Sequence, residues 1–176
     1  MKCKHKPNNR TRAGIGFITI SMLTLAGVVI GESTSQTAMA SDNKILPGHA
    51  CMPVGLASLV TDYSNPEFIR NATLLAQAHR YMCPVVRDDT NGELDFVRVR
   101  TENNESTGAV PTCTVWSVSV DGNAIDFETV VADPGLGFRN LEFSLSGFIE
   151  FDHGHYVIEC SLGKNDRIYS YRTNED

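Results

Sequence analysis

The chain has few cationic residues outside its first forty positions. Five of its 15 lysines and arginines but only one of its 21 acidic residues lie in residues 1–40, so ten cations and twenty acids remain, a net charge near −10. A surface of that sign repels phosphate backbones and anionic lipids. We therefore expect no nucleic-acid partner, and we interpret the acidity as a source of solubility outside the cell.

The sequence also lacks the motifs of common catalytic and metal sites. It has no Cys-x-x-Cys pair, which excludes thioredoxin-type and zinc-knuckle sites, and no Gly-x-Ser-x-Gly nucleophile elbow. His153 and His155 can point to one side of a strand, but no third metal ligand follows at a fixed spacing. The stretches at 88–92 and 121–123 resemble calcium loops only in composition, and turns explain both. We therefore predict no catalytic residue, no cofactor and no metal.

The first forty residues have the organisation of a secretory signal peptide. A basic segment precedes an apolar run from Ala13 to Ile30, and Ala38-Met39-Ala40 follows. The Ala-x-Ala ending predicts cleavage after residue 40. An uncleaved anchor is the alternative, since this run nearly spans a bilayer. We favour cleavage and expect a signal peptide over 1–40 and a secreted or periplasmic domain over 41–176, without stable membrane insertion.

Four cysteines remain in the mature chain: Cys51, Cys83, Cys113 and Cys160. An even number in an exported protein predicts two disulfides. Cys113 and Cys160 each lie beside apolar residues at alternate positions of an expected strand, so both can face the core and meet there. Cys51 and Cys83 then form the second bridge, which ties the N-terminal third to the rest of the fold.

Alternating apolar and polar residues predict short β-strands over much of the chain. The clearest alternation covers residues 94–101, 113–120, 141–151 and 156–162. The first of these segments places Phe96, Arg98 and Arg100 on one face. Asp121-Gly122 predicts a tight hairpin turn, and residues 156–162 are expected to form a second hairpin with residues 168–172.

The remaining segments are less regular. A strand is expected near residues 54–63, whereas residues 67–82 fit a helix or a strand. Many short strands separated by turns, with no helix–strand alternation, are typical of an antiparallel sandwich or barrel. We therefore predict an all-β fold: a single antiparallel β-sandwich, jelly-roll or immunoglobulin-like, stapled by two disulfides and preceded by the signal peptide.

Several short motifs carry a resemblance to a known group of proteins. They are Cys83-Pro84-Val85-Val86-Arg87-Asp88, Cys113-Thr114, Tyr156-x-x-x-Cys160-x-Leu162 and Ile168-x-Ser170-Tyr171. Together they resemble a family of small exported, disulfide-containing bacterial proteins of unknown function. The resemblance implies an extended chain leading into Cys83 and supplies no catalytic residue. Where such proteins often have a proline after the leucine, this chain has Gly163.

The aromatic residues suggest where a ligand would bind. Trp116 and Tyr156 lie on apolar strand faces, so we expect them in the core. Tyr169 and Tyr171 share a face of the last strand and form the candidate binding patch. The predicted function is an exported, non-catalytic domain that binds or packs against an extracellular or envelope component. The alternatives are a small secreted hydrolase with an unidentified site, or an inhibitor of a secreted protein that uses loop 102–108.

Overall fold

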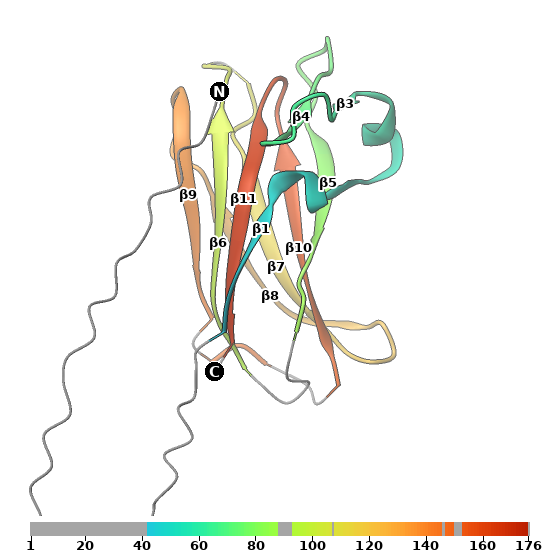
Figure 1. Ribbon diagram of the computed structural model, residues 1–176, viewed down its shortest axis with the longest axis vertical. Coiled ribbons are helices and arrows are strands. Elements are labelled where there is room, and N and C mark those ends of the chain that lie inside the picture. The colour runs from blue at the N-terminus through green and yellow to red at the C-terminus, as the bar shows by residue number, and fades with distance from the viewer. Residues whose placement is uncertain (1–41, 88–92, 107, 146, 150–152, 176) are drawn as a thin grey trace, which may run out of the picture. The chain divides into compact units, whose positions relative to one another are not determined.

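The structure, a computed structural model, describes residues 42–87, 93–106, 108–145, 147–149 and 153–175. The predicted signal peptide, the turn at 88–92 and Asp152 lie outside these residues. In the described part of the chain, no helix has the length and apolar character needed to span a bilayer. The elements, shown in Figure 1, are β1 (Asp42–Pro47), η1 (Gly48–Ala50), β2 (Met52–Pro53), η2 (Gly55–Leu59), β3 (Thr61–Asp62), β4 (Ile69–Asn71), β5 (His79–Pro84), β6 (Leu94–Asn103), β7 (Thr112–Val118), β8 (Ala124–Val131), β9 (Gly137–Ser144), β10 (His155–Leu162) and β11 (Arg167–Glu175).

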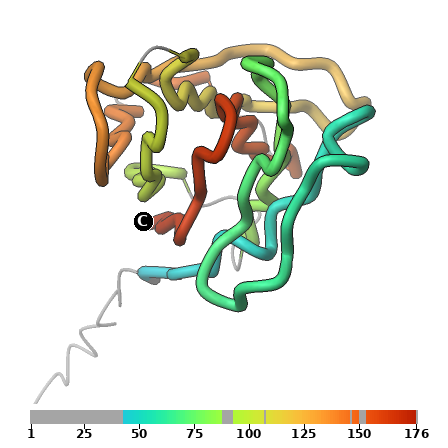
Figure 2. The backbone as a smooth tube through the Cα atoms, turned by 90° about the horizontal axis from the view of Figure 1, so that it is seen from above, coloured from blue at the N-terminus to red at the C-terminus, as the bar shows by residue number. Residues whose placement is uncertain are grey.

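The strands form two antiparallel sheets. The first, called here the β11 sheet, has the order β3-β4-β11-β6-β9, and β1 also pairs with β11. The second, called the β10 sheet, has the order β2-β5-β10-β7-β8. One face of each sheet is buried in a common core and the other is directed outwards. Figure 2 shows the path of the backbone seen from above. The predicted antiparallel β-sandwich is confirmed.

The connections identify this sandwich as a jelly roll. From β4 to β11, each pair of consecutive strands crosses from one sheet to the other, except β7 and β8. An immunoglobulin-like sandwich would contain several hairpins within one sheet, whereas strands that wrap between two sheets are typical of a jelly roll. The pair β7–β8 is the hairpin predicted at Asp121-Gly122, and Gly122 has the positive φ of 80° that such turns favour.

The second predicted hairpin is wrong, because β10 and β11 lie in different sheets. The turn between them, residues 163–166, is held by the fully buried Asp166, whose carboxylate accepts hydrogen bonds from the backbone N–H groups of Gly163 and Asn104, each 2.9 Å long. The buried Asn71 donates from Nδ2 to the carbonyl oxygen of Gly163 at 3.0 Å. These bonds stabilise a turn that carries the chain across the core. Alternation had indicated only that each strand has one buried face.

The N-terminal third is less regular than expected. Residues 67–82 contain no helix: β4 pairs with β11, and β5 places Tyr81 and Cys83 in the core. These tertiary contacts outweigh the helix propensity of the alanines between the two strands. The strand expected near residues 54–63 is also wrong in part, since η2 occupies most of it and only Thr61–Asp62 forms a strand.

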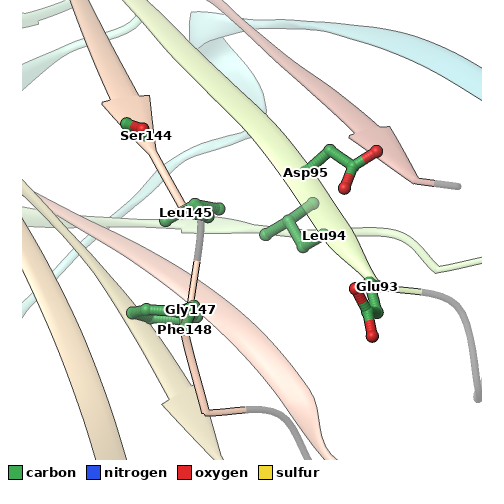
Figure 3. A pocket seen from close by; sticks show the side chains of 7 residues that line it. All are labelled: Glu93, Leu94, Asp95, Ser144, Leu145, Gly147 and Phe148. Atoms are coloured by element: carbon green, nitrogen blue, oxygen red, sulfur yellow. The ribbon is translucent and has the colours of Figure 1, made fainter.

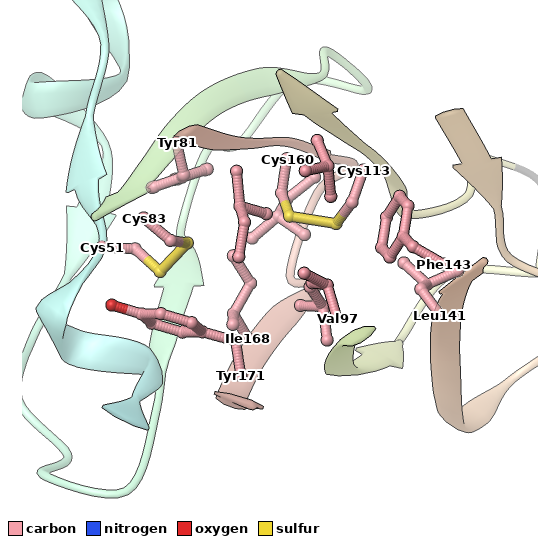
Figure 4. Packing of buried hydrophobic residues seen from close by; sticks show 14 of the residues in the cluster. Cys51, Tyr81, Cys83, Val97, Cys113, Leu141, Phe143, Cys160, Ile168 and Tyr171 are labelled. Atoms are coloured by element: carbon pink, nitrogen blue, oxygen red, sulfur yellow. A yellow bond between two sulfur atoms is a disulfide. The ribbon is translucent and has the colours of Figure 1, made fainter. Parts of the chain in front are cut away.

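Both disulfides lie in the core, and they join the predicted cysteines. Cys51 bonds to Cys83, and Cys113 bonds to Cys160 (Figure 4). Cys113 and Cys160 lie directly opposite each other on the neighbouring strands β7 and β10. All four cysteines are at most 1% exposed. The Cys113–Cys160 bridge therefore connects two strands of the β10 sheet, whereas the Cys51–Cys83 bridge joins the residue that precedes β2 to β5. Both bridges also contribute apolar surface to the core.

Candidate ligand-binding surface

A cavity lies beside the first residues of β6 and the end of β9 (Figure 3). It has a volume of about 530 Å³ and a lining that includes Glu93, Asp95, Ser144 and Phe148. None of its described lining residues is a histidine, so Ser144 has no imidazole base there to activate it as a nucleophile. The described lining therefore offers no serine–histidine pair.

The two spaced histidines do not lie in a metal-binding cluster of described residues. His153 is exposed in a turn, where it has a positive φ of 63°, and the exposed His155 is the first residue of β10. Within the described ranges, no three His, Cys, Asp or Glu residues are grouped so that they could hold a metal ion.

The loop proposed for an inhibitor is held against the sandwich where it is described. The backbone N–H of Asn104 donates to Asp166, and its side-chain amide donates to the carbonyl oxygen of Asn165 at 3.0 Å. Glu105 forms an ion pair with Lys164, with 3.2 Å between Oε1 and Nζ. These contacts bind the loop to the β10–β11 turn, so they give no support to a projecting inhibitory loop.

The predicted tyrosine patch is wrong for Tyr171. A β-bulge lies between Ile168 and Ser170 in the pairing of β11 with β6. The extra residue shifts the alternation, so that Ile168 and Tyr171 both face the core while Tyr169 stays on the outer face. Tyr171 is 1% exposed, and its hydroxyl donates to the carbonyl oxygen of Pro84 at 2.8 Å. Burial raises the pKa of Tyr171 to about 12.

Trp116 was expected in the core, and this prediction is also wrong. Cys113 and Val115 face the core, so Trp116 lies on the outer face of the β10 sheet, where its ring centroid is 5.0 Å from that of Phe127. A shallow hollow of about 240 Å³ beside Trp116 has a mainly apolar lining of Met82, Trp116, Val118, Ala124, Val157 and Glu159. Apolar side chains predominate in this hollow, and no described cation lines it.

The outer face of the β11 sheet differs, because it combines aromatic rings with arginines. Tyr169 lies between two phenylalanines, with its ring centroid 5.2 Å from that of Phe68 and 5.1 Å from that of Phe138. Phe68 is 9% exposed and so supports the cluster from within, whereas Phe138 is 50% exposed. The three residues form what we call the aromatic cluster, and Phe138 is its solvent-accessible member.

An ion pair fixes the position of Tyr169 in this cluster. Glu102 Oε2 is 2.9 Å from Arg167 Nη1 and accepts a hydrogen bond of 2.9 Å from the Tyr169 hydroxyl. The hydrogen bond with Tyr169 raises the pKa of Arg167, and burial raises the pKa of Tyr169. The Arg167 guanidinium also lies over Phe68, with Cζ 4.5 Å from the ring centroid. These contacts hold the cluster in one arrangement without a ligand.

Next to the aromatic cluster lies a groove with three arginines, called here the arginine groove. It has a volume of about 190 Å³ and is lined by Ile45, Arg98, Arg100, Asn140, Ser170 and Arg172. Its arrangement follows from the sheet register: Arg98 lies directly opposite Arg172, and Arg100 lies opposite Ser170 and Asn140. Directly opposite side chains start about 5 Å apart, so two arginines there repel each other.

The three guanidinium groups are neutralised unequally. Arg98 forms an ion pair with Glu142, with 2.8 Å between Nε and Oε1. Arg172 donates from Nε to the amide oxygen of Asn43 at 2.8 Å, and Arg100 lies with Cζ 4.9 Å from the centroid of the Phe138 ring. Neither Arg100 nor Arg172 forms an ion pair with any carboxylate of the described residues. The groove therefore holds two uncompensated positive charges.

The sequence contained part of this site but not all of it. The alternation in residues 94–101 placed Arg98 and Arg100 on one face, and this placement is confirmed. The contribution of Arg172 depends on the register between β11 and β6 and on the bulge that precedes it. No local pattern encodes either feature, so the groove could not be assembled from the sequence.

Comparisons with known proteins do not identify a family. No family model matches the sequence, and no curated protein matches it. Among solved structures, a family 6 carbohydrate-binding module is 9% identical with a TM-score of 0.44, and the match covers 76% of this chain and 94% of the module. An isomalto-dextranase from Arthrobacter globiformis complexed with panose is 14% identical with a TM-score of 0.41, covering 74% of this chain and 23% of the enzyme.

A third structure, the cleaved adhesin domain of Lys-gingipain from Porphyromonas gingivalis, is 15% identical with a TM-score of 0.32, covering 76% of this chain and 87% of that domain. Likenesses this distant carry no argument about function, which is therefore derived from the residues of this chain. The resemblance to small exported bacterial proteins stays a prediction.

Proposed function

We propose that this protein is an exported, non-catalytic domain that binds an extracellular or envelope glycan through the outer face of the β11 sheet. The observation that carries the proposal is the exposed ring of Phe138, which lies at the accessible end of the aromatic cluster and beside the arginine groove. An exposed aromatic ring supplies a large, rigid contact area at a small cost in conformational entropy.

The chemistry of this face matches the chemistry of a sugar. A sugar ring has an apolar face that can lie on an aromatic side chain and a polar rim that needs hydrogen-bond partners. Asn140 and Ser170 supply an amide and a hydroxyl in the groove next to Phe138.

Preorganisation also supports this face as the binding surface. The bonds of Glu102 to Arg167 and Tyr169 hold the cluster before any ligand arrives, so binding need not order these side chains. The outer face of the β10 sheet has Trp116 and Phe127 but no described cation in its hollow. The β11 sheet therefore offers more of the directional contacts that give a binding site its specificity.

The proposal is tested by two matched phenylalanine variants. Phe138→Ala removes the exposed ring on the edge strand β9, and Phe127→Ala removes an equivalent ring, 58% exposed against 50%, on the edge strand β8 of the other sheet. Each purified protein is run through gels that contain a panel of acidic and neutral polysaccharides, and retardation is measured. We expect Phe138→Ala to lose at least about tenfold in affinity, as a central interface aromatic does, and Phe127→Ala to bind like the unaltered protein.

Two results would contradict the proposal. One is the absence of retardation by every polysaccharide in the panel. The other is a loss of affinity in Phe127→Ala with normal binding by Phe138→Ala, which would move the binding surface to the β10 sheet. Each substitution removes an exposed side chain, so both variants should fold. Circular dichroism and the unfolding temperature of each variant check this.

A further inference from the structure

We infer that the arginine groove is a subsite for the acidic group of an anionic polysaccharide, so that the ligand class is a glycan carrying carboxylate or sulfate groups. This inference rests on the proposed function, because it takes the same face as the glycan-binding surface. It adds the charge of the ligand and the residues that recognise it: Arg100 and Arg172, with Arg98 beside them.

The first argument for an anion subsite is the uneven distribution of lysines and arginines. The chain after residue 40 has only ten lysines and arginines, and three of them line one groove of about 190 Å³. Arg98 and Arg172 even occupy directly opposite positions on neighbouring strands. Like charges in such positions destabilise a sheet, and local arrangements that reduce stability are expected at functional sites.

The contacts within the groove limit the repulsion between Arg98 and Arg172 but leave part of the positive charge without a carboxylate partner. The Phe96 ring lies under both opposed arginines, with its centroid 5.3 Å from Arg98 Cζ and 5.7 Å from Arg172 Cζ. Glu142 neutralises Arg98. Arg100 and Arg172 form no ion pair with a carboxylate of the described residues. A carboxylate or sulfate can accept two parallel hydrogen bonds from the guanidinium group of Arg100. Nε and Nη2 of Arg172 already donate to Asn43 Oδ1, so Arg172 offers an anion its charge and its Nη1. The groove is therefore complementary to an anion.

The net acidity of the protein does not oppose this binding at short range. Charges are screened over about 8 Å at physiological ionic strength, so an anion in the groove is attracted mainly by the nearest guanidinium groups. At longer range, a net charge near −10 repels anionic membranes and nucleic acids. A glycan is favoured over those polyanions because Phe138, Asn140 and Ser170 border the same arginines and can contact a sugar ring.

Charge variants in the groove and a matched arginine outside it test the inference. Arg100→Gln, Arg172→Gln and the double variant remove the charge and keep a polar side chain. Arg80→Gln is the control, because Arg80 lies on β5 of the other sheet with its side chain 61% exposed. Arg100→Lys keeps the charge but loses the planar pair of donors. All are assayed against polygalacturonate, alginate, hyaluronan and desulfated chondroitin, and against the methyl-esterified form of each polymer; chondroitin sulfate is compared with desulfated chondroitin to test the sulfate group.

We expect at least one acidic polymer to bind more tightly than its methyl ester, with an affinity that falls as salt is raised. Each single groove variant should then bind about tenfold more weakly or worse, since each loses a charge-assisted hydrogen bond. Arg100→Lys should retain part of the affinity, and Arg80→Gln should retain all of it. The double variant should lose most of the salt dependence.

The other outcomes separate the two proposals. If Phe138→Ala weakens binding but the arginine variants bind normally and esterification has no effect, the inference is wrong and the proposed function stands. If no polymer of either kind is bound, both are wrong. Anionic phosphatidylglycerol vesicles and polyglutamate complete the panel: arginine-dependent binding to either, without binding to any acidic glycan, would overturn the ligand class.

Discussion

Removal of either disulfide should lower the free energy of unfolding by nearly the same amount. The Cys113–Cys160 bond joins residues 47 apart in the sequence, and the Cys51–Cys83 bond joins residues 32 apart. In the chain-entropy model, loops of these lengths each stabilise the folded state by about 4 kcal/mol. The difference between the two is only about 0.3 kcal/mol, because loop entropy grows with the logarithm of length.

The variants are the alanine pairs Cys113→Ala/Cys160→Ala and Cys51→Ala/Cys83→Ala, each of which serves as the control for the other. Alanine is preferred to serine because all four side chains are buried, and a buried hydroxyl without a partner would add its own cost. Trp116 is the only tryptophan of the chain and lies on β7, so its fluorescence reports the unfolding of the β10 sheet.

Urea titration monitored by this fluorescence should show each alanine pair unfolding at a midpoint lowered by about 2 M, for a slope of about 2 kcal/mol per M. A loss below about 1 kcal/mol at either bridge would refute the chain-entropy reasoning for that loop. A difference of several kcal/mol between the pairs would show that packing of the sulfur atoms, rather than loop length, sets the contribution.

Two further predictions concern single positions in the core. Because burial raises the pKa of Tyr171 to about 12, the folded state keeps the phenol proton that the unfolded chain releases above about pH 10, and this group should lower the stability by about 2 kcal/mol between pH 10 and pH 12. Burial also raises the pKa of Tyr81 and Tyr169, so Tyr171→Phe should reduce the fall by about this amount rather than abolish it. Urea titrations across this range measure the fall, and an unchanged fall in Tyr171→Phe would contradict the assignment. Gly163→Ala places a Cβ atom 2.3 Å from the carbonyl oxygen of Ala109, and this overlap should lower the free energy of unfolding by about 1–3 kcal/mol. The control is Gly108→Ala, whose Cβ meets only the flexible side chain of Glu105 and should change the free energy of unfolding by less than about 0.5 kcal/mol. Equal effects of the two substitutions in calorimetry would refute the close approach at Gly163.

The sequence was sufficient for the cysteines and for most of the long strands, but not for the short N-terminal strands or for the order of the strands in the sheets. Alternation reveals that a strand has one buried face, as in Tyr156–Leu162, and both sheets of a sandwich provide such a face. The choice of partner for β11 depends on the buried turn around Asp166, whose bonds reach Asn104, far away in the sequence. A pattern read within one segment cannot contain that information.

The same limit explains the errors at the candidate site. The alternation in β11 predicted one shared face for Tyr169 and Tyr171, and a single bulge separated them. On β7 the pattern was correct but both faces carried apolar residues, so Trp116 was assigned to the core although Val115 occupies it. The arginine groove required the register of three strands at once. Such long-range features become visible only in the folded chain.

The central claim is that the outer face of the β11 sheet is the ligand-binding surface, and amide chemical shifts test it most directly. Isotope-labelled protein is titrated with oligomers of the polysaccharide that retards it most strongly in the gels. The account predicts shifts concentrated on the outward positions of β6, β9 and β11, including Arg100, Phe138 and Arg172, with little change near Trp116 and Phe127. Shifts centred on Trp116 and Phe127, or the absence of shifts with every oligomer tested, would contradict it.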